Sequence, residues 1–349
     1  SGTDVITITA KNSTDGGDNT NWSFPKPMSV GDPVTWTGAI DSDWNKAGNW
    51  KDKHDDARLP TADDKVIIPP GCENWPRVPS EMSFWGIVVD TNAQLTIAGG
   101  PLSVTNELRV AGTLAFSGYQ TLKVSAPTAS FADGTVVPGE STVRILDGVE
   151  TLDPGNCTFC RVEILRAGGE LALTDGFKAR SFEARATDEV SLTFAAGKTV
   201  EADTVVCCCN AAEKYLTLQS SAANEKWFLK SPRISYMTGV RVSDSTASDA
   251  KAVASLSVNV RESNVNWVFD NGVSEWVGGA SGTWAGNWPL DGTSQNKSIL
   301  QNAGDGGDGI VIVRLSVSGG EEPVDPPHTH VWGEWVTTKE PQVGVPGEK

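Results

Sequence analysis

One stretch of this chain sets its organisation: Thr35-Trp36-Thr37-Gly38-Ala39-Ile40-Asp41-Ser42-Asp43-Trp44-Asn45-Lys46-Ala47-Gly48-Asn49-Trp50. A second copy lies far downstream, at Glu275-Trp276-Val277-Gly278-Gly279-Ala280-Ser281-Gly282-Thr283-Trp284-Ala285-Gly286-Asn287-Trp288. In both copies the first two tryptophans are eight positions apart (44 − 36 and 284 − 276), a glycine follows the first tryptophan at the second position, and an Asn-Trp pair closes the motif. The chain therefore contains an internal repeat, and a repeat constrains the choice of fold.

The match continues upstream of each motif. Asn19-Thr20-Asn21-Trp22-Ser23-Phe24 corresponds to Asn264-Val265-Asn266-Trp267-Val268-Phe269, which gives a period of 267 − 22 = 245 residues. This period is too long for one supersecondary unit, so we expect a whole domain to repeat. The predicted organisation is the last coil of a preceding repeat (1–25), a complete repeat (26–269) made of a Trp-rich cap (34–75) and a β-solenoid (76–269), a truncated next repeat (270–318), and a Pro/Gly-rich linker and tail (319–349).

The charge of the chain argues against a nucleic-acid partner. Its 349 residues carry 28 Lys and Arg against 44 Asp and Glu, a formal net charge of −16, and the basic residues are spread thinly. No run of 18 apolar residues occurs, so no membrane insertion is expected. The low Lys content, with abundant Asn, Asp, Thr and Gly, favours an extracellular or cell-surface location.

Short strands are predicted throughout the middle of the chain. Between Phe84 and Val242, apolar and polar residues alternate in short runs bounded by Gly, Asp, Asn or Pro, as in Gln94-Leu95-Thr96-Ile97 and Thr121-Leu122-Lys123-Val124. Such alternation places one side of each strand in a core and the other in water. The sequence therefore predicts an all-β protein.

A right-handed parallel β-helix, or β-solenoid, fits these strands better than the alternative of tandem antiparallel β-sandwiches. About fifteen strands exceed what one sandwich or small barrel uses. The region lacks the Asn-Gly dipeptides of tight hairpins. Its inward positions are repeatedly Val, Ile, Leu and Phe, as expected where coils stack like on like, and at three strands per coil we expect roughly six to eight coils.

Three motifs carry a resemblance to known proteins: the Trp-Gly…Trp…Asn-Trp segment, the strand Asp63-Asp64-Lys65-Val66-Ile67-Ile68-Pro69, and the closing Asn-x-Asn-Trp-x-Phe. Together they resemble the repeat units of very large secreted or cell-surface bacterial proteins, in which such units are similar to right-handed parallel β-helices. The resemblance covers roughly residues 1 to 300. It implies a structural role, because these motifs carry no known chemistry.

The six cysteines predict neither a metal site nor a redox centre. Cys157 and Cys160 form a single Cys-x-x-Cys with no second half to complete a zinc site. Strand alternation sends Cys207 and Cys209 to one face and Cys208 to the other, which is poor geometry for binding one ion. We expect buried packing or a local disulfide.

The candidates for catalysis are sparse. His54 lies beside Asp55 and Asp56, but no Gly-x-Ser-x-Gly elbow accompanies it. A polysaccharide lyase would need carboxylates and basic residues gathered on one outer face. The nearest candidates for that role are Arg161, Glu163, Arg166, Arg180, Glu183 and Arg185. A solvated charge ladder explains these residues better, so no catalytic residue is assigned.

The sequence offers two classes of candidate binding residue. The candidates for calcium are three Asp-rich turns, Asp15-Gly16-Gly17-Asp18, Asp41-Ser42-Asp43 and Asp305-Gly306-Gly307-Asp308. No EF-hand spacing or nonapeptide array is present and ordinary turns explain them better, so no cofactor is assigned. The candidates for stacking on glycan rings are Trp36, Trp44, Trp50 and Trp75. Tryptophans in a repeated cap are more often buried, which favours a structural role for them.

The expected function is a non-catalytic structural or adhesive repeat domain of a large extracellular bacterial surface protein, acting as a stalk or scaffold. Its expected partners are neighbouring repeats of the same polypeptide, with surface polysaccharide or host glycan as further candidates. The first alternative is a carbohydrate-binding module, and the weaker one is a β-helix polysaccharide lyase.

Overall fold

The computed structural model describes residues 8–9, 16–23 and 28–270. The second copy of the Trp-Gly motif and the tail at 319–349 lie outside the described residues, as does nearly all of the predicted truncated repeat at 270–318. The described part consists of strands and turns with two short 3-10 helices, η1 (Ala47–Asn49) and η2 (Val260–Glu262).

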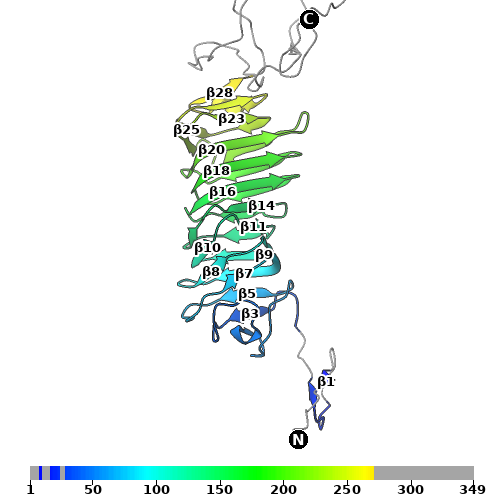
Figure 1. Ribbon diagram of the computed structural model, residues 1–349. Helices are drawn as coiled ribbons and strands as arrows, with labels where there is room; N and C mark the ends of the chain where they lie inside the picture. Colours follow the sequence, from blue (N-terminus) through cyan, green and yellow to red (C-terminus); the bar gives the residue numbers. More distant parts are fainter. Residues whose placement is uncertain (1–7, 10–15, 24–27, 271–349) are drawn as a thin grey trace, which may run out of the picture. The chain divides into compact units, whose positions relative to one another are not determined.

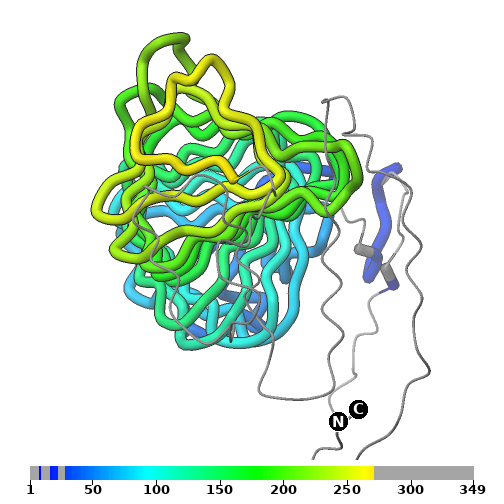
Figure 2. The backbone as a smooth tube through the Cα atoms, turned by 90° about the horizontal axis from the view of Figure 1, so that it is seen from above, coloured from blue at the N-terminus to red at the C-terminus, as the bar shows by residue number. Residues whose placement is uncertain are grey.

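Residues 28–270 form a parallel β-solenoid of about nine turns (Figure 1). Successive coils lie over one another when the stack is viewed along its length (Figure 2). The strands that stack between coils pair in parallel, so the predicted β-helix is confirmed and the alternative of tandem antiparallel sandwiches is wrong.

The strands form three faces, which we call A, B and C. Face A contains β7 (Met82–Val89), β9 (Leu102–Val110), β11 (Thr121–Val124), β14 (Thr142–Ile145), β16 (Thr158–Arg166), β18 (Phe177–Ala186), β20 (Thr199–Cys209), β23 (Ser235–Thr238), β26 (Ala252–Ser255) and β28 (Trp267–Asp270).

Face B contains β3 (Pro33–Trp36), β5 (Lys65–Ile68), the second halves of β7 and β9, β12 (Thr128–Ser130), β15 (Thr151–Asp153), β17 (Gly169–Leu173), β19 (Val190–Phe194), β21 (Leu216–Ser220), β24 (Val240–Val242) and β27 (Val258–Asn259). Face C contains β6 (Arg77–Val78), β8 (Gln94–Ile97), β10 (Thr113–Phe116), β13 (Thr135–Val137), the first residues of β16, β18 and β20, then β22 (Trp227–Ser231) and β25 (Ser245–Asp249). Three further strands are β1 (Ile8–Thr9), β2 (Trp22–Ser23) and β4 (Trp50–Asp52).

The estimate of six to eight coils was too low. The long strands β16, β18 and β20 each run through a corner and contribute to both face C and face A. The sequence estimate treated each alternating run as one strand on one face. Because some runs serve two faces, that estimate gave too few turns. Alternation itself was interpreted correctly, since β11 and β19 alternate between buried and partly exposed residues along their length.

The core is a set of rows in which one apolar side chain stacks on the next. One such row joins Leu102, Leu122, Val143, Val162 and Phe182, all of them buried. Burial of each such side chain contributes about 1.5–3 kcal/mol. Because each row is continued by the neighbouring coil, the solenoid interior is one core rather than a set of separate ones.

The first coil holds the Trp-Gly motif, and three tryptophans of the motif pack on one another. Trp36 and Trp44 each meet Trp50 edge to face, with ring centroids 4.8 and 4.6 Å apart, and all three are at most 2% exposed. The indole N–H of Trp36 donates to the Asn74 carbonyl at 2.7 Å, and that of Trp50 to the Trp44 carbonyl at 2.8 Å. Buried indoles need such acceptors.

The remaining residues shared by the two motif copies have structural roles in the first copy. The buried Asn49 side chain accepts hydrogen bonds from the backbone of Ile40 and Asp41 and donates to Asp41 and to the Asp43 carbonyl. It therefore satisfies four polar groups of the loop between the tryptophans. Gly38 has φ +59°, and a Cβ there would lie 2.4 Å from the Asn74 carbonyl oxygen, so only glycine fits.

The upstream match between the repeats also has a structural counterpart. The Ile8 N–H donates to the Asn21 carbonyl at 2.8 Å, and the Ala252 N–H donates to the Asn266 carbonyl at 3.1 Å. Asn21 and Asn266 both adopt left-handed backbone, with φ of 63° and 58°. Asparagine tolerates this conformation better than most residues, and each asparagine precedes the tryptophan that opens the paired strand, so the two segments share one local structure.

We predict that Gly38→Ala destabilises the solenoid far more than Gly71→Ala. Both glycines have positive φ, which costs an alanine about 1–2 kcal/mol, but a Cβ at Gly71 meets nothing within 4 Å. The clash with Asn74 adds about 1–3 kcal/mol at Gly38 alone. Urea unfolding measures the difference, and equal losses in the two variants would show that the close approach at Gly38 contributes nothing.

Candidate functional site

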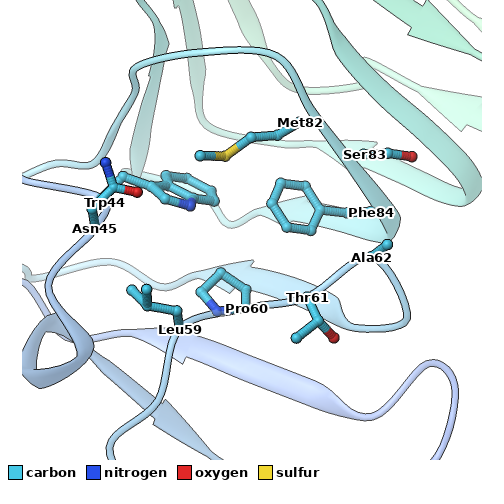
Figure 3. Close-up of a pocket in the computed structure, with 9 residues that line it drawn as sticks. All are labelled: Trp44, Asn45, Leu59, Pro60, Thr61, Ala62, Met82, Ser83 and Phe84. Carbon is cyan, nitrogen blue, oxygen red and sulfur yellow. The ribbon is translucent and has the colours of Figure 1, made fainter.

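A small pocket of about 180 Å³ lies beside the Trp-Gly motif (Figure 3). Three segments line it: the motif loop, the loop at 59–62 and the start of β7. Its lining residues are Trp44, Asn45, Leu59, Pro60, Thr61, Ala62, Met82, Ser83 and Phe84.

Two aromatic rings form the inner wall of this pocket. Trp44 packs against Phe84 with ring centroids 5.5 Å apart and a tilt of 39°. Figure 3 shows the indole nitrogen of Trp44 on the edge that faces Leu59 and Pro60. Unlike the indoles of Trp36 and Trp50, this one donates no hydrogen bond to any of the residues that the structure describes.

The chemistry available in the pocket is limited. Its volume lies below the roughly 300–1,000 Å³ of ordinary small-molecule sites. None of its nine lining residues is an acid, a base or a thiol. The polar groups at hand are the amide of Asn45, the hydroxyls of Thr61 and Ser83 and the Trp44 N–H, which suit contact with a ligand better than proton transfer.

A buried ion pair holds the loop that forms one wall. The Asp64 carboxylate is 2% exposed and accepts two hydrogen bonds of 2.7 Å from the Arg58 guanidinium. It also accepts from the backbone N–H and the hydroxyl of Thr61, at 2.6 and 2.8 Å. Burial alone would raise the pKa of Asp64, but these hydrogen bonds outweigh it and hold the pKa below the ordinary value of 3.8.

The four tryptophans proposed for glycan stacking differ in how deeply they are buried. Trp36, Trp44 and Trp50 lie in the core, whereas Trp75 is half-buried against it. A sugar can stack only on an exposed ring face, so in this conformation the prediction depends on Trp75.

Of the residues considered for a lyase, Arg161, Glu163, Glu183 and Arg185 lie on neighbouring strands of face A, whereas Arg180 lies at a corner and Arg166 is buried. Glu163 pairs with Arg144 at 2.7 Å and Glu183 pairs with Arg185, while Arg180 forms two hydrogen bonds with Glu140. Within each of these pairs the positive and the negative charge neutralise each other.

Arg166 is separated from this group by its burial. It is 7% exposed and donates to the carbonyls of Val149 at 2.6 Å and Gly168 at 3.2 Å. Desolvation lowers its pKa. Its side chain therefore hydrogen-bonds two backbone loops, at Val149 and Gly168, and does not reach the outer face.

The cysteines pack as the alternation predicted. All six are free, and Cys207 and Cys209 belong to the core whereas Cys208 faces outward beneath Arg185, whose Nη1 lies 3.6 Å from its Sγ. Burial raises the pKa of the Cys207 and Cys157 thiols, which keeps them protonated and weakly nucleophilic.

In one of the three candidate turns for calcium, Asp41-Ser42-Asp43, the first carboxylate is already hydrogen-bonded to protein donors. The Asp41 carboxylate accepts hydrogen bonds from Lys46, from the backbone of Asp43 and from Asn49, and these lower its pKa to about 2. Within residues 8–9, 16–23 and 28–270, no group of three or more His, Cys, Asp or Glu side chains is arranged to hold a metal ion. The candidate turn at Asp305 lies outside the described residues.

Comparisons of the chain with protein-family models, with curated proteins and with solved structures found no match. A search of the described helices for one that is long and apolar enough to cross a membrane also found none.

We predict that acid weakens the wall of the pocket through Asp64. Because its pKa is depressed in the fold, the stability that this carboxylate contributes is present above the ordinary value of 3.8 and is lost as the pH falls through the folded pKa. Replacing the partner by Arg58→Met leaves a buried carboxylate unpaired and should cost about 3–5 kcal/mol at neutral pH.

Unfolding free energies measured between pH 7 and pH 2 check this prediction. Asp64→Asn should flatten the acid limb relative to the parent, whereas Asp63→Asn, next to it in the sequence and outside the ion pairs of the described residues, should leave the limb unchanged. An identical acid limb in all three proteins would contradict the role of Asp64.

Proposed function

We propose that residues 26–269 are one repeat unit of a non-catalytic structural or adhesive array in a large extracellular bacterial surface protein. The observation that carries this proposal is the shared local structure at Asn21 and Asn266. The two segments have the same hydrogen bond, the same left-handed asparagine and the same following tryptophan. A motif that recurs both in sequence and in strand pairing supports the repetition of a whole domain.

The proposed role of the Trp-Gly motif is to cap the solenoid. A stack of coils has two ends at which the apolar interior would meet water. At one end, β4 pairs antiparallel with β3, and Trp36, Trp44 and Trp50 fill the space over the first interior row. Large rings fixed by hydrogen bonds cover more apolar area than aliphatic side chains could.

A structural role is also supported by what the outer surface offers. The pocket beside Trp44 is small and has no titratable lining residue. Both outward carboxylates of face A between β11 and β18, Glu163 and Glu183, are paired with an arginine. These features suit a rigid spacer whose surface contacts other molecules without reacting with them.

The proposal predicts that the protein does not cleave uronic-acid polymers. Incubation with polygalacturonate or alginate should release no reducing ends and no unsaturated product that absorbs in the near ultraviolet. Cleavage that is abolished by Arg161→Gln, but not by Lys198→Gln on another face, would overturn the structural role in favour of a lyase.

A further inference from the structure

Face A carries a local excess of positive charge in an acidic chain. From β11 to β18 its outward charged residues are Lys123, Arg144, Arg161, Glu163, Glu183 and Arg185. Four of these are cations and two are carboxylates. Figure 1 shows these strands stacked one above another.

Two of the four cations form no ion pair and no side-chain hydrogen bond with the residues that the structure describes, although the charge of Arg161 helps to lower the pKa of Glu140. Arg144 pairs with Glu163 and Arg185 with Glu183. Lys123 and Arg161 take part in none of the ion pairs or side-chain hydrogen bonds found in residues 28–270. Both are partly exposed, so each can still bind an anion.

The strand register brings the unpaired cations close to Arg144. Lys123 lies directly beside Arg144 on the adjacent strand, and Arg161 lies one strand further on, opposite Thr142. Neighbouring strands are about 4.8 Å apart. Like charges this close repel each other, and an anion bound between them would relieve the repulsion.

An exposed aromatic ring flanks this group at the corner between β10 and β11. Tyr119 is 78% exposed, the largest exposure among the large apolar side chains of the described residues. It lies close enough to Arg180 for the two to interact electrostatically. A flat ring beside fixed polar groups is suited to stacking on a sugar.

The net charge of −16 does not prevent an anion from binding here. At physiological ionic strength the Debye length is about 8 Å, so charges on the other faces are largely screened. A nucleic acid fits this surface less well, because its binding depends on neutralising many phosphates, and only two cations are uncommitted.

We propose that face A binds an acidic glycan, with Lys123 and Arg161 holding its carboxylate or sulfate groups and Tyr119 stacking on a sugar ring. This inference goes beyond the structural array and does not depend on it. It places the glycan on side chains that the tryptophan hypothesis did not include.

The test measures binding of the full chain to heparin and polygalacturonate by calorimetry, with dextran as the neutral control. The double variant Lys123→Gln/Arg161→Gln should weaken binding by about tenfold or more, because each charge-assisted hydrogen bond is worth more than a neutral one. Tyr119→Ala should weaken it by about threefold to tenfold through loss of stacking. Raising the salt concentration should also weaken binding.

The matched control is Lys51→Gln/Lys198→Gln, which removes the same charge from exposed lysines on other parts of the surface. It should bind as the parent does, and all variants should keep the parental melting temperature. Equal losses in both double variants, no binding of either polymer at 50 mM salt, or equally tight binding of poly-aspartate would each overturn the proposal. Binding without cleavage would leave the structural role intact, so the two proposals fail separately.

Discussion

The register between successive coils is the constraint on which the rest of the structure depends. Along the row that begins at Leu102, the stacked residues are separated by 20, 21, 19, 20 and 23 positions, ending at Val205. Strands in the middle of the stack pair with the coil before and the coil after, so their backbone donors find acceptors in a neighbouring coil. A slip of one residue would turn the apolar row to solvent. Interior packing and the outer charge pattern are therefore fixed together.

The strand alternation could be predicted because it is a local signal. The strand at Lys65–Ile68 and the outward turn of Cys208 followed from such patterns. Pairs such as Glu140 with Arg180 could not be predicted, because the coils differ in length and 40 residues separate these partners. Because the coils differ in length, the sequence also did not predict that Lys123 and Arg144 are neighbours. Their positions depend on strand register and not on sequence distance.

The tryptophans illustrate how composition alone misleads. A motif rich in Trp, Gly and Asn is compatible with a sugar-binding surface and with a capping core. The structure buries Trp36 and Trp50 completely and shows what Asn49 and Gly38 do for them, which no residue count could reveal. The most exposed aromatic ring of the described residues is instead Tyr119, in a turn that carried no motif. Binding at such a position would add a contact surface to the proposed spacer without altering its core.

The most direct test of the account is to stretch single molecules of the full chain between its ends. If residues 28–270 are one cooperative solenoid unit, they should unfold in one main event that lengthens the chain by about 800 Å, at up to about 3.6 Å per residue. A series of several small, independent events across this region would contradict a single stacked unit and the scaffold role built on it.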